Sequence, residues 1–186
     1  MDNVYFLKGK RIFLRPLEVE DVNGPYLSWV NDKEITKYLD VGLFPTNKED
    51  LKSFILNKHQ NRSNFAICTI AQDLHIGNCS YSEINWIHRI AGCGIMIGNK
   101  DYWGKNIMQE TYSLLIDYAF NTLSIRRITA GVVSDNLAAI ITLEKLGFQT
   151  EGLFRKHRFY DGKYVDIIRF GLFSEEFIPF SINEEK

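Results

Sequence analysis

The residues best suited to chemistry lie within residues 91–120, where an apolar run gives way to an amphipathic pattern. Cys93–Ile97 form the apolar run, and Gly98–Asn106 form a polar segment rich in Gly and Asn. From Ile107 onward, apolar residues recur at helical spacing. A strand, turn and helix in this order point unpaired N–H groups and a helix dipole at the space ahead of the helix. This arrangement suits a phosphate group, and Lys105 adds positive charge.

Two common phosphate-binding loops do not match this segment. A Walker A loop requires Ser or Thr after its Gly-Lys pair, whereas Asn106 follows Lys105 here. A dinucleotide-binding fingerprint requires three glycines, and the loop has only Gly104. Alternatively, the segment is an ordinary strand-to-helix turn that binds no ligand.

The loop resembles the pyrophosphate-binding loop of GNAT-superfamily N-acetyltransferases, which use acetyl-CoA. That loop reads Gln/Arg-x-x-Gly-x-Gly/Ala and is often written Tyr-Trp-Gly-Lys-Gly, and Tyr102–Asn106 reads YWGKN. Residues 129–148 (TAGVVSDNLAAIITLEKLGF) are similar to the superfamily's next strand–helix unit. Residues 27–34 (LSWVNDKE) and 159–166 (FYDGKYVD) resemble the branch containing the ribosomal-protein N-terminal acetyltransferases RimJ and RimL. Together these ordered matches span about residues 11–173.

The resemblance implies an α/β (α+β) fold, with a mixed, mostly antiparallel sheet flanked by helices. Its two central strands are expected to splay into a V that admits the pantetheine arm of acetyl-CoA. Asn136 is expected to bond that arm and also to cap the following helix. Backbone N–H groups of the strand at 95–97 are expected to polarise the thioester carbonyl. The implied cofactor-binding residues are Ile95, Met96, Ile97, Trp103, Gly104, Lys105, Asn106, Ile107 and Asn136.

The implied reaction moves an acetyl group directly to a primary amine, so no enzyme nucleophile is required. Two of the superfamily's acid–base positions differ here: Leu143 stands where many members carry a Tyr, and residues 91–94 read AGCG where relatives carry a Glu. Glu83 is the leading base candidate, and it equally fits a solvated strand-end carboxylate. His88 is a second candidate or a surface loop residue. Water or a C-terminal hairpin tyrosine, Tyr160 or Tyr164, could also carry a proton.

The acceptor side is expected around Trp29, Asn31 and the loop 41–45, which includes Phe44. Acceptors in the resembling branch include protein N-termini, polyamines, amino acids and amino sugars. The near-neutral charge of the chain mildly disfavours a specialist for polyamines or basic peptides. An amino sugar, including a nucleotide-linked one, is an alternative to a protein N-terminus.

Two further classes of function remain open. The missing Tyr and Glu are compatible with a non-catalytic acyl-CoA-binding sensor or regulatory module. A nucleotide-binding protein that does not use CoA would bind ADP or NAD but not acetyl-CoA.

The length predicts a single domain over residues 1–186, in which the resemblance covers a core at about 11–173. Residues 174–186 are expected to form an acidic, loosely held tail. The net charge of −1 argues against nucleic acid as a main partner, and no apolar run reaches membrane-spanning length. The first residues lack a signal-peptide pattern. Three cysteines without metal-ligand spacing indicate reduced thiols in a cytoplasmic protein with no metal. A homodimer is expected by resemblance.

Residue patterns also predict the individual elements. The predicted strands are 10–17, 65–70, 76–84, 92–97 and 126–133, and a hairpin spans 149–173 around Asp161-Gly162. The predicted helices are 18–30, interrupted at Gly24-Pro25; 46 or 47 to about 61; 107–123; and about 136–146, with Gly147 just past its end.

Overall fold

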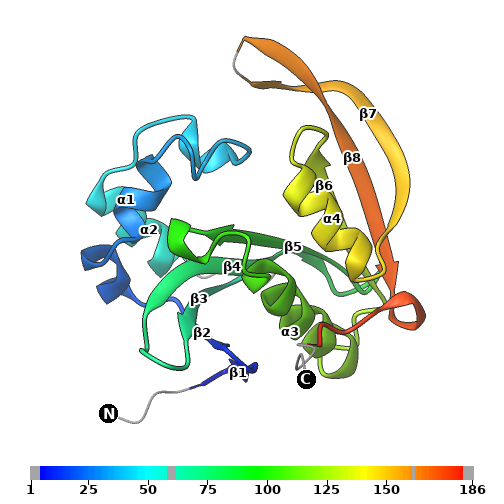
Figure 1. The fold of residues 1–186 in the computed structure, drawn as a ribbon, viewed down its shortest axis with the longest axis horizontal. Coiled ribbons are helices and arrows are strands. Elements are labelled where there is room, and N and C mark those ends of the chain that lie inside the picture. Colours follow the sequence, from blue (N-terminus) through cyan, green and yellow to red (C-terminus); the bar gives the residue numbers. More distant parts are fainter. Residues whose placement is uncertain (1–4, 58–61, 161, 182–186) are drawn as a thin grey trace.

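One twisted eight-stranded sheet organises the chain, in the order β1-β2-β3-β4-β5-β6-β8-β7 (Figure 1). The computed structural model describes residues 5–57, 62–160 and 162–181. The strands are β1 (Leu7–Lys8), β2 (Ile12–Pro16), β3 (Ser63–Thr69), β4 (His75–Asn85), β5 (Ile90–Ile97), β6 (Arg127–Val133), β7 (Gln149–Tyr160) and β8 (Lys163–Phe173). The helices are α1 (Tyr26–Asn31), α2 (Lys48–Leu56), α3 (Ile107–Asn121) and α4 (Leu137–Lys145), with 3-10 turns η1 (Val19–Asn23), η2 (Asp40–Gly42), η3 (Lys100–Tyr102) and η4 (Ser174–Glu176).

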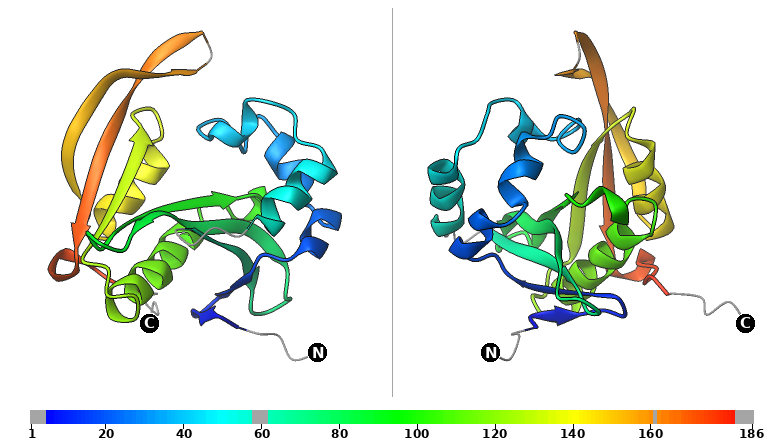
Figure 2. Two further views of the ribbon diagram at one scale, coloured as in Figure 1. Left: turned by 180° about the vertical axis from the view of Figure 1, so that it is seen from behind. Right: turned by 60° about the vertical axis from the view of Figure 1, so that its left-hand side comes forward.

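All neighbouring strands are antiparallel except the central pair, β5 and β6. These two strands pair over only three residue positions, from Ile90 opposite Arg127 to Gly92 opposite Thr129. Beyond Gly92, β5 stays paired with β4 and β6 stays paired with β8, so the two central strands separate (Figures 1 and 2). The expected mixed sheet and its central splay are therefore confirmed.

Helices cover the two faces of the sheet differently. Ala91, Ile95 and Ile97 of β5 belong to the main core, which also contains the buried side chains of α3 and α4. Met96 packs into a second cluster with Trp29 and other residues of α1. Because successive strand residues point to opposite faces, α3 and the α1–α2 region lie on opposite sides of β5.

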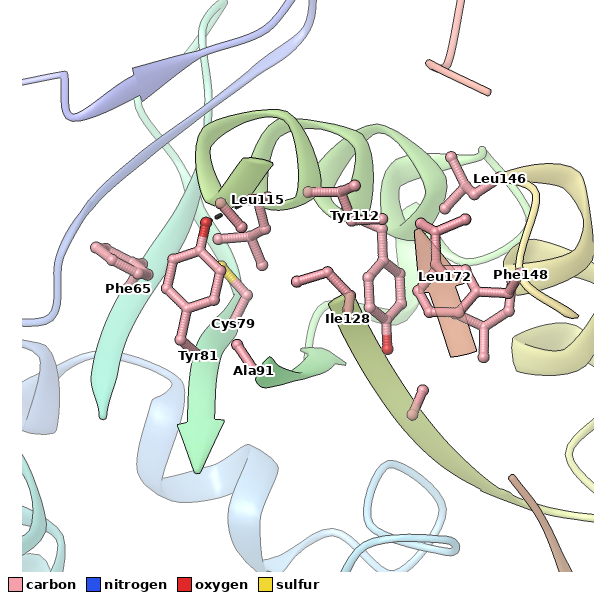
Figure 3. Close-up of a cluster of buried hydrophobic side chains, with 14 of the residues drawn as sticks. Phe65, Cys79, Tyr81, Ala91, Tyr112, Leu115, Ile128, Leu146, Phe148 and Leu172 are labelled. Atoms are coloured by element: carbon pink, nitrogen blue, oxygen red, sulfur yellow. Dashed lines mark hydrogen bonds between the residues drawn. The ribbon is translucent and has the colours of Figure 1, made fainter. Parts of the chain in front are cut away.

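The main core fills the space between α3 and the middle of the sheet (Figure 3). The Tyr81 hydroxyl donates to the Leu115 carbonyl of α3, so this buried phenol is satisfied. Glu110 fixes the first turn of α3, because its carboxylate accepts from the backbone N–H groups of Lys10 and Arg11 at 2.9 Å each. The Nε of Arg11 adds a third bond at 2.8 Å. The start of α3 is thereby tied to the segment between β1 and β2.

Local signals fixed several element ends as predicted. Asn136 caps α4 by accepting from the Ala139 N–H, and Gly147 ends that helix with a φ of 96°. The segment 18–30 is split at Gly24-Pro25 into η1 and α1, as the interruption indicated. The Asn47 side chain, rather than that of Thr46, accepts from Asp50 to begin α2. The helix ends at Leu56, earlier than the predicted Asn61, which lies outside the described residues.

The C-terminal segment differs from the expected loose tail as far as residue 181. Phe177 packs against the main core, and the Ile178 N–H donates to the Leu146 carbonyl at 3.0 Å. The Phe180 N–H donates to Ser113 Oγ of α3 at 3.0 Å. Apolar residues within an acidic sequence therefore dock this segment against the end of α4 and the middle of α3. Residues 182–186 and Asp161 of the predicted turn lie outside the described residues.

A buried polar network lies beside Trp29 on the α1 side of the sheet. Arg15 donates to both carboxylate oxygens of Asp21, at 2.9 and 2.7 Å. His75 Nδ1 lies 3.5 Å from Asp21 Oδ1, and the other ring nitrogen, Nε2, contacts the Gly77 carbonyl at 3.0 Å and Asn78 Oδ1 at 2.9 Å. Burial lowers the pKa of His75. Burial alone would raise the pKa of Asp21, but the bonds from Arg15 and the Glu18 N–H lower it overall.

We expect the free energy of unfolding to decrease as the pH falls from about 7 to 5, because folded His75 resists protonation while an unfolded His titrates near pH 6.5. The unfolded state then binds more protons, so stability rises with pH across this window. Asp21 acts in the same direction at lower pH, since its folded pKa is lowered. Urea titrations at several pH values should show a smaller change in the free energy of unfolding between about pH 7 and 5 in His75→Gln than in the parent. An unchanged slope in that variant would contradict the assignment to His75.

Candidate functional site

The segment leading into α3 presents a row of unpaired backbone donors. The N–H groups of residues 104–109 donate to no described residue, and the first intrahelical bond runs from the Glu110 N–H to the Asn106 carbonyl. A helix N-terminus normally leaves up to four such groups free, and here the preceding turn extends the row. The helix dipole adds partial positive charge at the same point, and Lys105 is exposed beside it. This is an arrangement that binds an anion such as a phosphate.

The shape of this loop depends on two left-handed residues and two anchors. Gly104 has a φ of 71° and Asn106 a φ of 58°, so Asn fills its position in a conformation it tolerates better than most residues. The Trp103 indole donates to the Ile97 carbonyl at 2.8 Å, and the Arg11 guanidinium donates to the Lys105 carbonyl at 2.8 Å. A Cβ on Gly104 would meet nothing within 4 Å. The space ahead of the loop is therefore open.

The splay between β5 and β6 leads directly to this loop. From Cys93 to Ile97 the edge of β5 that faces β6 pairs with no strand in the described part of the chain, and the chain enters the loop shortly after Ile97. Asn136 lies just beyond the end of β6, on the other arm of the V. Its side-chain oxygen caps α4, and its side-chain NH₂ donates to no described residue. The fold thus brings together the segments named for cofactor binding: 95–97, 103–107 and Asn136.

A pocket of about 270 Å³ opens on the opposite face of the sheet and reaches residues 94–96 of the same strand. Its floor is a row of cross-strand neighbours, Asn64 on β3, Ser80 on β4 and Gly94 on β5. Gly94 leaves the floor open at the splay, since an added Cβ there would meet only Ser80 Oγ, at 3.5 Å. The apolar walls and charged rim are formed by Leu17, Val30, Phe54, Met96, Asp40 and Arg62, among others.

Of the residues named for the acceptor side, Val41 of the loop 41–45 lines this pocket, whereas Trp29, Asn31 and Phe44 are not among its lining residues. Trp29 is 6% exposed, packs edge-on against His75 at 5.1 Å between ring centroids, and lies against Gly98. The Asn31 side chain bonds both the N–H and the carbonyl of Thr46. Phe44 is 79% exposed. In the described structure, Trp29 supports the second core cluster and Asn31 holds the loop 41–45; their contact with an acceptor remains a prediction.

Both candidate bases lie at the closed end of the splay. Glu83 occupies a bulge of β4 opposite Ala91, with a φ of 52°, and its side chain is exposed. Its neighbour Ile84 packs into the main core, so the bulge leaves Glu83 outside that core. His88 is exposed in the turn between β4 and β5, and its carbonyl accepts from Arg126 Nε. Of the two, Glu83 lies closer along the sheet to the point where β5 and β6 separate.

Tyr112 is a residue that the sequence patterns did not single out. It lies on the buried face of α3 with 8% exposure, and its ring contacts Phe148 at 6.5 Å between centroids. Its ring descends toward the sheet beside Ile128, with the hydroxyl at the end away from α3 (Figure 3). That hydroxyl bonds to no described residue, and it is not completely buried from solvent. An apolar-face Tyr at helical spacing resembles any core residue, so no sequence signal distinguished it.

The surroundings of Tyr112 are the buried side chains near the start of the splay. Cys93 and Leu143 belong to the same core cluster, and Leu143 is fully buried. Burial raises the pKa of the Cys93 thiol to about 12, and burial likewise raises the pKa of Tyr112 well above its ordinary value. Both groups therefore keep their protons at neutral pH, and Tyr112 is a hydroxyl that can donate one.

The chain is similar to known proteins both at the level of a family and as individual relatives. The family model described as "Acetyltransferase (GNAT) domain" matches residues 11–149. "Uncharacterized N-acetyltransferase p20" of Bacillus licheniformis is 32% identical over 175 residues, covering 92% of this chain and 97% of the relative. The spermidine N(1)-acetyltransferase of Vibrio cholerae is 29% identical over 170 residues, covering 91% and 97%.

A solved structure agrees with these sequence matches. The crystal structure of the Vibrio cholerae spermidine N-acetyltransferase in complex with CoA and spermine aligns with a TM-score of 0.80 and 28% identity, covering 89% of this chain and 96% of that one. No helix in the described ranges is long and apolar enough to cross a membrane. The family model spans most of the sequence, and the named relatives are N-acetyltransferases. The chain is therefore an enzyme of the GNAT acetyltransferase superfamily, whose reaction is acetyl transfer to an amine.

Proposed function

We propose that the protein transfers the acetyl group of acetyl-CoA to a primary amine of a small molecule or a protein N-terminus. The observation that carries this proposal is the segment 93–96 of β5. Its unpaired edge borders the splay that leads to the phosphate-type loop, and its other face forms the floor of the pocket at Gly94. A thioester on one side and an amine on the other can therefore meet at one strand.

The described residues fit acetyl-CoA in three places. The free N–H groups of residues 104–109 would hold the pyrophosphate, with Lys105 adding charge. The unpaired edge of β5, from Ile95 to Ile97, would bond the pantetheine arm and polarise the thioester carbonyl. The free NH₂ of Asn136 would bond the arm from the other side. An acetyl thioester supplies an acyl carbon that is already activated toward nitrogen.

Glu83 is proposed to remove the proton that the attacking ammonium must lose, directly or through one water molecule. Its exposed position in the bulge keeps it outside the apolar core and near the start of the splay. The new C–N bond forms as the C–S bond breaks, and the nitrogen releases its second proton to water, or to Glu83 once Glu83 has passed the first proton to solvent.

Tyr112 is proposed to donate its proton to the leaving sulfur. Its hydroxyl is protonated, has no bond to a described residue and lies in the cluster beside Cys93. Leu143, which cannot donate, stands at the position where many relatives carry a Tyr. In this chain the acid would thus come from α3 instead of α4, and solvent would return the proton to Tyr112 after the sulfur departs.

Other aspects of the proposal depend on the resemblance in the sequence. We place the protein in the cytoplasm as a homodimer, near the RimJ and RimL branch that residues 27–34 and 159–166 resemble. The proposed chemistry requires no metal, nucleic acid or membrane.

The experiment that tests this function is calorimetric titration of acetyl-CoA followed by an amine screen scored by product mass. Binding together with an acetylated product supports the proposal. Binding without turnover on any amine would favour the non-catalytic sensor. A folded protein that binds ADP or NAD but not acetyl-CoA would contradict both.

We expect Glu83→Gln to lower kcat by about 100-fold, a typical effect of losing a general base. The isosteric amide cannot accept the proton, and activity should recover in part as the pH rises and free amine becomes more abundant. His88→Gln, a change in the neighbouring turn, should alter kcat less than about twofold on the same reasoning. The pH–rate profiles of the two variants provide the measurement. If His88→Gln showed the larger loss, the base would have to be reassigned.

A further inference from the structure

The rim of the pocket over β3–β5 carries two charged side chains, of which one is paired and the other is available to a ligand. Asp40 is the only carboxylate among the described lining residues, and it is already paired with Arg158 of β7. Arg62 is the only guanidinium among these described lining residues, and it forms no hydrogen bond or ion pair with a described residue. Its guanidinium lies over the Phe54 ring at 5.0 Å from the centroid. The stacked, planar group is thus held in place with its donors available.

A second donor without a described partner lies beneath the pocket floor, on Asn78. Because His75 Nε2 faces the Gly77 carbonyl, that nitrogen carries a proton, and it therefore faces the oxygen of Asn78. The Asn78 NH₂ must point the other way, and it is buried without any partner among the described residues. A buried donor without a partner is destabilising unless a ligand oxygen satisfies it. Arg62 is exposed at the rim and can bind acceptor atoms of a ligand directly, whereas the Asn78 NH₂ is covered by protein atoms.

A polyamine cannot supply those atoms. At neutral pH its nitrogens are protonated and act only as donors, and they are best matched by several carboxylates. The described lining offers one carboxylate, which Arg158 already occupies. The buried Asp21 nearby is likewise neutralised by Arg15. The relatives named for spermidine thus share the fold with this chain but do not define its acceptor.

The positions of Gly94 and Arg62 in the pocket determine how far apart the amine and the anion of the ligand must be. Gly94 lies at the splay, Ser80 is its cross-strand neighbour, and Asn64 is the neighbour of Ser80 on β3, near Arg62. Strands are about 4.8 Å apart, so the backbone at Asn64 lies roughly 10 Å from Gly94, and Arg62 precedes Asn64 by two residues. Between them the walls are apolar, formed by Leu17, Val30, Phe54 and Met96.

Building on the proposed function, we propose that the acceptor is a short amine with an anionic group, carboxylate or phosphate, at its opposite end. Arg62 binds the anion, and the amine lies at Gly94. Amino-terminal dipeptides and amino sugar phosphates have this layout. Polyamines and simple alkylamines do not.

Matched probes test the anion directly. L-leucyl-L-leucine is compared with its C-terminal amide, glucosamine 6-phosphate with glucosamine, and spermidine serves as the polyamine. Acetylation rates are measured at saturating acetyl-CoA, and binding of each probe is measured by calorimetry on the protein saturated with CoA. We expect at least one anionic probe to exceed its neutral partner about tenfold or more in kcat/KM, as for a hydrogen bond to a charged group. The carboxylate and phosphate pairs show which anion is used.

Variants at Arg62 test whether the preference for anionic probes depends on this pocket. Arg62→Met keeps an apolar stem over Phe54 and should raise KM for the anionic probe about tenfold, while leaving its neutral partner nearly unchanged. Lys52→Gln removes one positive charge from an exposed site of α2 outside the pocket lining and serves as the control. Arg62→Glu should improve the rate with spermidine relative to the parent.

The outcomes separate this proposal from the broader function. Efficient acetylation of spermidine with no anion preference, or an unchanged KM in Arg62→Met, would overturn the acceptor class and leave the acetyltransferase function intact. Acetyl-CoA binding with neither binding nor acetylation of any anionic probe would also overturn the acceptor class alone. A folded parent that fails to bind acetyl-CoA would instead reject the proposed function.

Discussion

Replacing Gly104 with valine is expected to weaken acetyl-CoA binding by about 100-fold or more, because several charge-assisted bonds to one pyrophosphate would be lost together. Gly104 has a φ of 71°, a conformation that a β-branched residue rarely adopts. Nothing lies within 4 Å of the position of a Cβ, so the protein itself does not exclude the new side chain. The valine would occupy the space where the phosphates approach the free N–H groups.

Calorimetric titration of parent and variant provides the measurement, and Gly162 provides a matched control. Gly162, in the β7–β8 turn, has a φ of 77° and also has open space around a Cβ position. Gly162→Val therefore imposes similar backbone strain far from the loop, and it should leave acetyl-CoA binding unchanged. If Gly104→Val remained folded and bound acetyl-CoA like the parent, the row of N–H groups would not be the pyrophosphate site.

Replacing Tyr112 with phenylalanine is expected to lower kcat by about 100-fold while changing acetyl-CoA affinity little, as for loss of a general acid. Because the hydroxyl has no partner among the described residues, its removal should leave the free energy of unfolding almost unchanged. The ring contact with Phe148 is kept. A loss of rate without a loss of stability would separate a chemical role from a packing role.

A second readout does not depend on turnover. Ultraviolet absorbance of the thiolate gives the pKa of the CoA thiol in the bound state, and Tyr112→Phe should raise that pKa because a donor to the thiolate is removed. Tyr118→Phe removes another phenol of α3, whose ring contacts Phe6, and serves as the control. An unchanged thiol pKa together with full activity would exclude Tyr112 as the acid.

Elements governed by short-range signals were predictable from the sequence. Gly147 ends α4 because only a residue tolerant of positive φ fits there, and Asn136 begins it through its own side chain. Long-range pairing was not predictable in this way. The three-residue ladder of β5 with β6 depends on contacts between segments more than thirty residues apart, and the splay was expected only by resemblance. Strand β1 was not predicted because its two residues are too few to show an alternating pattern.

The site residues also differ in whether a local sequence pattern or only the tertiary structure reveals them. The loop 102–106 was recognisable because its spacing is local. Trp29 resembles an exposed recognition aromatic in the sequence, but the fold packs it against His75 and Gly98. Arg62 and Tyr112 had no local signature, since the first depends on Phe54 beneath it and the second on a hydroxyl left without a partner. Only tertiary structure shows which polar groups remain unsatisfied.

The docked segment 177–180 affects how the cofactor would enter. It bonds the end of α4 through Leu146 and the middle of α3 through Ser113, so it joins the two helices that flank the splay. The opening between β5 and β6 is therefore braced from outside and does not need to be forced apart by the ligand. Such pre-organisation lowers the conformational cost of association. Acetyl-CoA should accordingly bind in a single fast step, with little rearrangement of the backbone.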